Sequence, residues 1–336
     1  MSKKGVLLVN LGTPDSPKNS DVRKYLREFL TDKRVIDIPW LPRQLLVKGI
    51  IAPFRAPSSA KSYKEIWDDE RGSPLLYHSQ DLHKKVEEKL GDGYQVELAM
   101  RYQSPSINDA LERLRGNNVD DITVLPLFPH YASASGGSVI DKVMEITGSW
   151  LTVPNIRFIS SFYDHPKFID AFVEKGQMFN HADYDHVLFS YHGLPERHLR
   201  KSDTNNHCLQ KENCCGSICD NNKMCYSAQC HDTTRLLAER LGISPENYTT
   251  CYQSRLGKDP WVQPYTIKVL EELAHAGKKN LLVFSPAFVA DCLETIFEIA
   301  VEYQEDFEKW GGEHVQMVES LNDSDTWVDC IIDLVG

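Results

Sequence analysis

The sequence lacks the glycine-rich motifs of common nucleotide-binding folds. It contains neither GxxxxGKS/T nor GxGxxG. The segment LGTPDSP, which follows the apolar run Val6–Asn10, lacks the repeated glycines that let a backbone wrap a pyrophosphate. Nucleotide binding is therefore not the first expectation for this chain. Tandem repeats and low-complexity segments are absent as well.

A net positive charge and long apolar runs are also missing. Lysine and arginine total 37 against 48 aspartates and glutamates, a formal net charge of −11. This balance argues against nucleic acid as the main partner, because a phosphate backbone requires a basic surface, but it does not exclude metal cations. The apolar run after Met1–Lys4 is too short for a signal peptide or a transmembrane helix. We therefore expect a cytoplasmic protein, in which stable disulfides are uncommon.

The spacing of apolar residues predicts an α/β protein with parallel sheets. Short apolar runs typical of buried strands occur at Val6–Asn10, Tyr94–Ala99, Ile122–Leu125, His186–Ser190 and Asn280–Phe284. Amphipathic helical patterns separate them, at Asp81–Leu90, Ser106–Arg115, Ala228–Leu241 and Pro264–Ala276. With 336 residues the chain is long enough for two such blocks. We expect domains at 1–150 and 151–336, with the last helix packing back on the first domain.

Ligands of open α/β sheets bind outside the carboxyl ends of the strands. This rule marks four candidate site loops, at residues 10–14, 126–137, 191–195 and 285–291. The alternative for each loop is a plain connection. A further candidate is Ile38–Pro57, which is apolar, broken by prolines and partly basic. This segment is either a buried helical hairpin or an apolar lip that grips a flat hydrophobic ligand or contacts a membrane surface.

Two motifs contain residues suited to proton and metal chemistry. SYHGLP places His192 directly after an apolar strand, where an imidazole can accept a proton near neutral pH or bind a metal. The alternative is a structural histidine. In ADCLETIFE, a helix would place Asp291, Glu294 and Glu298 on one face, and Glu302 would extend the row by a turn. Such a row can pass hard cations or protons, although a solvated acidic face has the same pattern.

Together with a third motif, QSRLGKDPW at Gln253–Trp261, and with LLVNLGTPDSP near the start, these motifs resemble the ferrochelatases. Those haem-synthesis enzymes insert ferrous iron into protoporphyrin. The resemblance extends from Gly5 to about Leu321. It implies two similar Rossmann-like domains, each a parallel sheet flanked by helices, with the active-site cleft between them.

The resemblance also implies roles for individual residues. His192 matches the catalytic histidine and Glu294 the carboxylate that faces it across the porphyrin, so both are expected near the substrate iron. Asp291 and Glu298 match an acidic path for metal or protons. The expected porphyrin-binding residues are Leu11, Arg101, Tyr102, Tyr131 and Trp261. Cys292 stands where some members have histidine, which argues against a mechanism that needs a second histidine there.

The implied chemistry is the exchange of two pyrrole protons for one ferrous ion. A flat porphyrin hides its nitrogen lone pairs, and a site that bends the ring exposes them at the expense of binding energy. The hypothesis is that His192 accepts the pyrrole protons on one face. Glu294, with Asp291 and Glu298, would handle the metal or the departing protons on the other.

Six of the nine cysteines lie in one polar segment, His207–Cys230. The segment has no apolar pattern of its own, so another interaction must order it. It contains no CxxC pair of the kind typical of zinc sites. Disulfides, a zinc site and an iron–sulfur cluster all remain open from the residues alone, the first being disfavoured in the cytoplasm.

The resemblance favours a 2Fe–2S cluster in this segment. Animal ferrochelatases take one cluster ligand from the stretch that matches HYASASGG, where this chain has Ser133, and three from a C-terminal extension without a counterpart here. Certain bacterial members place all four ligands in an internal insertion after SYHGLP, which corresponds to residues 203–230. The expected ligands are Cys208, Cys215, Cys225 and Cys230, with Cys214 or Cys219 as substitutes. The expected role is structural or redox-sensing.

Two other functions stay open at this point. One is a chelatase of the same fold that acts on coproporphyrin or inserts cobalt. The other is a tetrapyrrole carrier without catalysis, against which the retention of His192 and the acidic row argues. The expected partners are protoporphyrin IX and ferrous iron, without nucleic acid. We expect a monomer, with a peripheral membrane contact through Ile38–Pro57.

Overall fold

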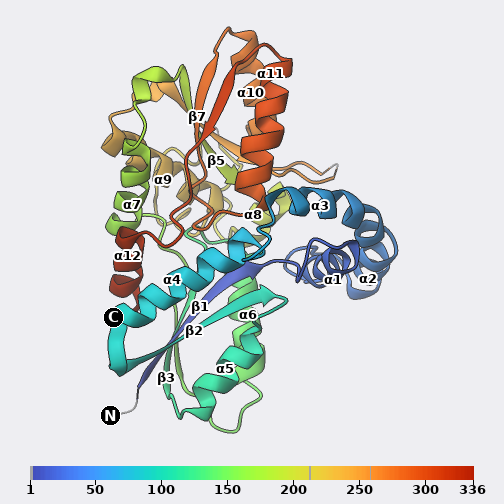
Figure 1. Cartoon of the computed structure of the whole chain (residues 1–336), viewed down its shortest axis with the longest axis vertical. Helices are drawn as coiled ribbons and strands as arrows, with labels where there is room; N and C mark the ends of the chain where they lie inside the picture. Colours follow the sequence, from blue (N-terminus) through green and yellow to red (C-terminus); the bar gives the residue numbers. More distant parts are fainter. Residues whose placement is uncertain (1–2, 212, 258) are drawn as a thin grey trace. The chain divides into compact units, whose positions relative to one another are not determined.

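The computed structural model describes residues 3–211, 213–257 and 259–336. The chain forms two compact units. Unit 1 comprises Met1–Phe128, Ala132–Ser161 and Asp323–Gly336, and unit 2 comprises Pro129–Tyr131 and Phe162–Asn322. Each unit contains a four-stranded parallel sheet flanked by helices (Figure 1). The predicted α/β class with parallel sheets is confirmed.

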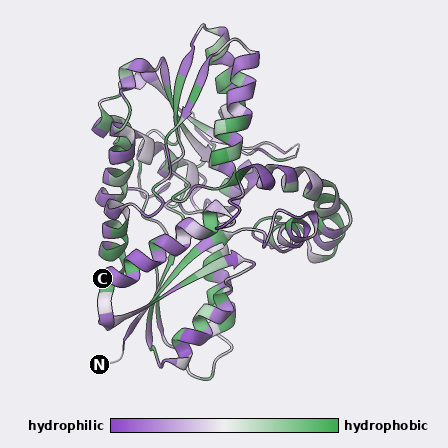
Figure 2. Ribbon diagram, viewed as in Figure 1, coloured by the Kyte–Doolittle hydropathy of each residue, from purple (hydrophilic) through white to green (hydrophobic). Residues whose placement is uncertain are grey.

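The sheet of unit 1 has the strand order β2-β1-β3-β4. Its strands are β1 (Lys4–Gly12), β2 (Tyr94–Tyr102), β3 (Asp121–Pro126) and β4 (Asn155–Phe158). One face of the sheet packs on α5 (Ile107–Gly116) and α6 (Gly136–Thr147). The other face packs on α4 (Pro74–Leu90), against which α12 (Asp325–Val335) lies. Figure 2 shows hydrophobic colouring on these strands and mixed colouring on the covering helices, as burial of both sheet faces requires.

The sheet of unit 2 has the equivalent order, β6-β5-β7-β8. Its strands are β5 (His186–His192), β6 (Tyr248–Gln253), β7 (Asn280–Phe284) and β8 (His314–Met317). One face is covered by α10 (Thr266–His275), the π-helix η5 (Leu293–Tyr303) and α11 (Gln304–Lys309). The remaining long helices of this unit, α7 (Pro166–Gln177) and α9 (Tyr226–Leu241), pack against each other. The short α8 (Glu196–Ser202) follows β5.

All five predicted strands and all four predicted helices occur. The strands are β1, β2, β3, β5 and β7, and the helices are α4, α5, α9 and α10. Three edge strands, β4, β6 and β8, were missed because NIRF, YTTCYQ and HVQM are short and half polar. Three 3₁₀ turns complete the described elements: η2 (Gly91–Gly93), η3 (His181–Asp183) and η4 (Pro245–Asn247).

The segment Ile38–Pro57 is helical but not buried. It contains α2 (Trp40–Leu46), the π-helical η1 (Val47–Ile51) and the start of α3 (Ala52–Ile66), which contacts α1 (Asn19–Leu30). Large apolar side chains point outward, with Trp40 66% and Phe54 79% exposed. The buried-hairpin interpretation is therefore wrong, because the largest apolar side chains of this segment are exposed and only Arg43, Val47, Ala52 and Ala56 are buried. None of the helices in the described ranges has the length and apolar character needed to cross a membrane.

Candidate functional site

His192 is the last residue of β5, the strand that pairs with both β6 and β7. The chain passes from one side of β5 to the other between β6 and β7, so His192 lies at the switch point where α/β sheets bind ligands. Its side chain is half-buried, and Nδ1 is 2.7 Å from the carbonyl oxygen of Gly193. Because a carbonyl can only accept, Nδ1 carries the proton, and Nε2 keeps a lone pair that can accept one.

Gln253, the last residue of β6, connects this histidine turn to the π-helix. Its side chain is 1% exposed. Its carbonyl oxygen accepts from the Gly193 amide at 2.8 Å, and its Oε1 accepts from Ser190 Oγ at 2.7 Å. Its Nε2 donates to the Glu294 carbonyl oxygen at 2.7 Å and to Glu298 Oε2 at 3.0 Å. One side chain thus fixes the backbone at Glu294 relative to the end of β5.

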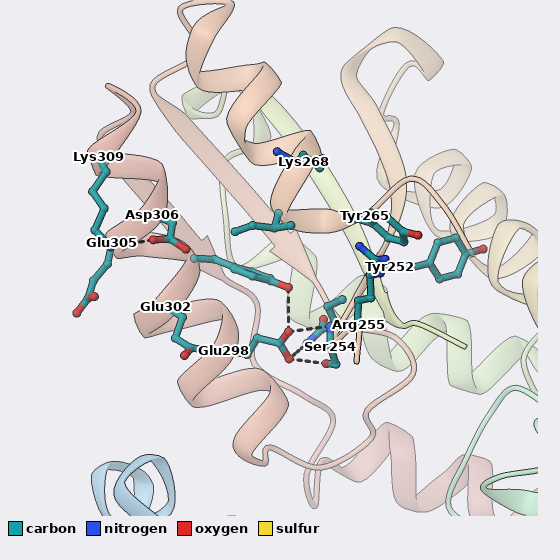
Figure 3. Close-up of a pocket in the computed structure, with 13 residues that line it drawn as sticks. Tyr252, Ser254, Arg255, Tyr265, Lys268, Glu298, Glu302, Glu305, Asp306 and Lys309 are labelled. Carbon is teal, nitrogen blue, oxygen red and sulfur yellow. Dashed lines mark hydrogen bonds and ion pairs between the residues drawn. The ribbon is translucent and has the colours of Figure 1, made fainter. Parts of the chain in front are cut away.

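Glu298 is held by four donors. Oε1 accepts from the Ser254 amide at 2.8 Å and from the Tyr303 hydroxyl at 2.9 Å. Oε2 accepts from Gln253 Nε2 and from Ser254 Oγ. Figure 3 shows the carboxylate of Glu298 pointing toward Ser254 from the π-helix. Burial raises the pKa of Tyr303, so its hydroxyl keeps the proton that it donates.

The prediction that Asp291, Glu294 and Glu298 lie on one face of a helix is wrong for Asp291. The helix begins at Leu293, after Asp291, and has i→i+5 hydrogen bonds. Asp291 is 5% exposed, with Oδ1 accepting from Thr295 Oγ1 at 3.0 Å and Oδ2 from Asn322 Nδ2 at 2.9 Å. Its carboxylate therefore anchors the start of η5 instead of continuing the row.

The last two members of the acidic row, Glu298 and Glu302, line a pocket in unit 2. The pocket has a volume of about 450 Å³. Glu298, Glu302, Glu305 and Asp306 contribute carboxylates to it, and Figure 3 shows Glu302 and Glu305 following Glu298 along the helical segment. Basic residues also line it, namely Arg255, Lys268 and Lys309. Glu302 is exposed and Glu298 is half-buried. Carboxylates at such successive depths can transfer cations or protons from one to the next.

Cys292 lies beside Glu294 at the start of η5. It is the N-cap residue, and its thiol shares a hydrogen bond with the Glu294 carboxylate. Burial raises the pKa of Cys292 well above its ordinary value, with the negative charge of Glu294 acting in the same direction. The group is therefore a neutral thiol that donates to Glu294.

Two aromatic rings flank the His192 imidazole. The ring centroids of Trp261 and Phe288 each lie 6.3 Å from it. Trp261 was expected near the porphyrin, whereas Phe288, in the loop after β7, was not. Tyr131, also expected there, is half-buried, and its backbone N–H donates to Gln229 Oε1 at 2.7 Å.

The expected porphyrin residues of unit 1 lie at the carboxyl ends of β1 and β2. Leu11 is half-buried at the end of β1. Arg101 Nη2 is 2.7 Å from Asp32 Oδ2, and the Tyr102 hydroxyl donates to the same oxygen at 2.9 Å. Ser138 Oγ donates to it as well. Tyr102 is fully buried, so its ring lies inside unit 1 and its hydroxyl supports the Asp32–Arg101 ion pair.

The cysteine segment brings several thiols together. The thiols of Cys208 and Cys215 each hydrogen-bond to Cys225, and Cys214 Sγ is 3.8 Å from Cys215 Sγ. Cys219 is exposed, whereas Cys230 is fully buried on α9 and hydrogen-bonds to the Tyr226 hydroxyl. The bond from Cys215, with backbone N–H groups at the start of α9, lowers the pKa of Cys225 to about 6. Thiolates are the form that binds iron or zinc.

Within the residues that the structure describes, no three His, Cys, Asp or Glu side chains are arranged as a metal site. Some of the thiols hydrogen-bond to one another. An iron–sulfur cluster takes four sulfur ligands, and the six cysteines of the segment exceed that number. Cys208, Cys214, Cys215 and Cys225 form a continuous set of contacts, and Cys230 lies one helical turn further along the chain.

Sequence reasoning missed the residues that hold the site together. Gln253, Ser254 and Tyr303 bind the acidic row, and Tyr226 contacts the His192 backbone. Gln253 and Ser254 fall in the QSRLG motif at a strand end, which was a usable signal. Tyr226 and Tyr303 have no comparable signal, because a tyrosine in a helix is most often a core residue.

Comparisons with known proteins agree over nearly the whole chain. The family model described as Ferrochelatase matches residues 3–336. A ferrochelatase of Legionella pneumophila (strain Paris) is 47% identical over 334 residues, covering 99% of each chain. A ferrochelatase of Coxiella burnetii (strain Dugway 5J108-111) is 43% identical over 331 residues, covering 98% of this chain and 92% of that one.

Two solved structures share the fold. SirB from Bacillus subtilis with Fe3+ has a TM-score of 0.52 at 11% identity, covering 98% of this chain and 93% of that chain. The sirohydrochlorin chelatase SirB from Bacillus subtilis subspecies spizizenii, in complex with cobalt, has a TM-score of 0.50 at 11% identity. It covers 99% of this chain and 94% of its own. At this identity the similarity concerns the fold alone.

Replacing Glu298 by glutamine should lower the free energy of unfolding by about 2 to 4 kcal/mol. Each carboxylate oxygen faces two donors, one of them an N–H group, so either orientation of the amide places its NH2 against a donor. Urea unfolding measures the change. The control is Glu302→Gln on the same helix, where the exposed side chain should cost no more than about 0.5 kcal/mol. Equal losses in the two variants would contradict the assignment.

Proposed function

Because the chain belongs to the ferrochelatase family, we propose that its porphyrin is protoporphyrin IX and that His192 and Glu294 act on it. The protein is a lyase that inserts ferrous iron into a porphyrin in haem synthesis. Iron is the substrate of this reaction, and two pyrrole protons leave as one ferrous ion enters. No observation favours coproporphyrin, cobalt or a carrier without catalysis.

The hydrogen bond between His192 Nδ1 and the Gly193 carbonyl oxygen is the observation that carries the assignment. The Nδ1–H group donates to this oxygen, so Nε2 is the nitrogen with a lone pair. We assign Nε2 as the acceptor of pyrrole protons. Trp261 and Phe288 provide apolar surface beside the imidazole, which suits a flat macrocycle.

Glu294 is the proposed carboxylate for the metal or the second proton. Gln253 fixes its backbone, and the Cys292 thiol donates to its side chain. Glu298 and Glu302 continue from it toward solvent as the proposed path for metal or protons. Asp291 keeps a place in the site as the residue that anchors the start of η5, which positions Glu294.

Leu11 and Arg101 in unit 1 and Tyr131 and Trp261 in unit 2 are the proposed porphyrin contacts. Each lies at, or after, the carboxyl end of a strand. Tyr102 contributes indirectly, because its buried hydroxyl and Arg101 share the carboxylate of Asp32.

Replacing His192 by alanine should lower the rate of ferrous iron insertion at least about 100-fold, because the proton acceptor is lost. Porphyrin affinity, measured by fluorescence quenching, should change by no more than about threefold, because the apolar surface remains. Glu294→Gln should act in the same way, as it keeps the shape of the side chain. His275→Ala, on the exposed end of α10, is the control. A His192→Ala variant with most of its rate would refute the assignment.

We also propose that the cysteine segment holds a 2Fe–2S cluster. Cys208, Cys215 and Cys225 are the proposed ligands that contact one another, and the lowered pKa of Cys225 suits a thiolate ligand. For the fourth ligand, the contact of Cys214 with Cys215 favours Cys214 over Cys230, whose thiol is engaged by Tyr226. Cys219 is the remaining substitute. When bound, the cluster supplies a redox-active centre whose iron–sulfur bonds order the segment.

Elemental analysis of protein purified without oxygen tests the cluster. We expect about two irons and two acid-labile sulfides per chain, without zinc. Cys214→Ser should lose both, whereas Cys230→Ser and the control Cys330→Ala should keep them. Loss of iron in Cys230→Ser alone would restore Cys230 as the fourth ligand. One zinc without sulfide, or no metal at all, would refute the cluster.

The proposed location is the cytoplasm, with peripheral contact to a membrane surface. The support for the contact is the exposed apolar row of Trp40, Leu41, Leu45, Ile50 and Phe54. The proposed oligomeric state is a monomer.

A further inference from the structure

Within the cysteine segment, Cys225 directly precedes a tyrosine that contacts the backbone of His192. Cys225 is the N-cap of α9, and Tyr226 is the first residue of the helix. The Tyr226 hydroxyl donates to the carbonyl oxygen of His192 at 2.8 Å. Tyr226 is 8% exposed, and burial raises its pKa well above the ordinary value, so the hydroxyl keeps its proton.

The hydrogen bond from the Tyr226 hydroxyl fixes the carbonyl side of the peptide group between His192 and Gly193. The peptide that joins His192 to Gly193 presents its C=O to Tyr226 and its N–H to the Gln253 carbonyl oxygen at 2.8 Å. The following carbonyl, that of Gly193, accepts from His192 Nδ1. The plane of the peptide therefore sets the position of the oxygen that orients the imidazole. Removal of the Tyr226 hydroxyl breaks one of the two hydrogen bonds that hold this peptide group and leaves the bond to Gln253.

The loop thiols attach to α9 on both sides of Tyr226. Cys225, before it, accepts hydrogen bonds from Cys215 and Cys208. Ser227, after it, contacts Cys215 Sγ at 3.3 Å and pairs with the Tyr252 hydroxyl at 2.8 Å. A change in these thiols, by metal binding or by substitution, thus acts on the turn that contains Tyr226.

We propose that Tyr226 is a positioning residue for His192 and that it transmits the state of the loop thiols to the His192–Gly193 peptide. This inference rests on the proposed function of His192. It also gives the cysteine segment an effect on the reaction that requires no contact with the porphyrin. The ring of Tyr226 also packs near His130, with centroids 6.0 Å apart, and this contact needs the ring and not the hydroxyl.

The substitution Tyr226→Phe removes the hydroxyl and keeps the aromatic ring, so it tests the hydrogen bond alone. We expect kcat for iron insertion to fall about five- to tenfold with KM for porphyrin changed by no more than about twofold, since one hydrogen bond is lost. Hydrogen exchange at the Gly193 amide should become at least about fivefold faster. The control is Tyr191→Phe, at a fully buried tyrosine whose hydroxyl pairs with Thr234 Oγ1. Unchanged exchange in Tyr226→Phe would overturn the positioning role.

A double-mutant cycle tests the transmission. Cys215→Ser should speed exchange at the Gly193 amide when Tyr226 is present and should add nothing in Tyr226→Phe. Cys219→Ser, an exposed thiol of the same segment, is the control. No effect of Cys215→Ser, or additive effects of the two changes, would overturn the coupling. Because exchange needs no turnover, faster exchange without a fall in kcat would refute the catalytic assignment of His192 and leave the mechanical link standing.

Discussion

The hydrogen bonds of Gln253 are the constraint on which the arrangement of the proposed site in unit 2 depends. One residue accepts from the histidine turn through its backbone and from Ser190 through its side chain, and it donates to the backbone of Glu294 and to Glu298. Each bond contributes about 1 kcal/mol, but leaving any of these buried groups unpaired would cost more. Gln253 therefore fixes the separation between a strand end and a helix that are otherwise about 40 residues apart in sequence.

Unit 1 has a comparable hub at the end of its own sheet. There the buried carboxylate of Asp32 accepts from Arg101, Tyr102 and Ser138. A charge withdrawn from solvent is tolerated when its hydrogen-bonding capacity is filled, which holds for the buried Asp32 and for the half-buried Glu298. In both units the hub lies at the carboxyl end of the strands, where the fold leaves room for a ligand.

The strands could be predicted because buried parallel strands are continuous apolar runs, as VLLVN and HVLFS are. The short edge strands β4, β6 and β8 carry half-polar sequences and gave no such signal. The motifs predicted His192, Glu294 and Glu298 as site residues, and the structure places them at the end of β5 and on η5. Asp291 was misplaced because helical spacing was assumed before the helix begins, and the contacts of Gln253 and Tyr226 depend on segments that only the fold brings together. The thiol contacts within His207–Cys230 were equally inaccessible, since the segment has no periodicity.

A structure of the protein with metal-free protoporphyrin bound would test the central claim most directly. The account predicts His192 Nε2 within hydrogen-bonding distance of a pyrrole nitrogen, about 2.6 to 3.2 Å, and the Glu294 carboxylate facing the opposite side of the macrocycle. Trp261 and Phe288 should contact the ring edge. A macrocycle bound away from His192, or one that presents its pyrrole nitrogens to another base, would contradict it.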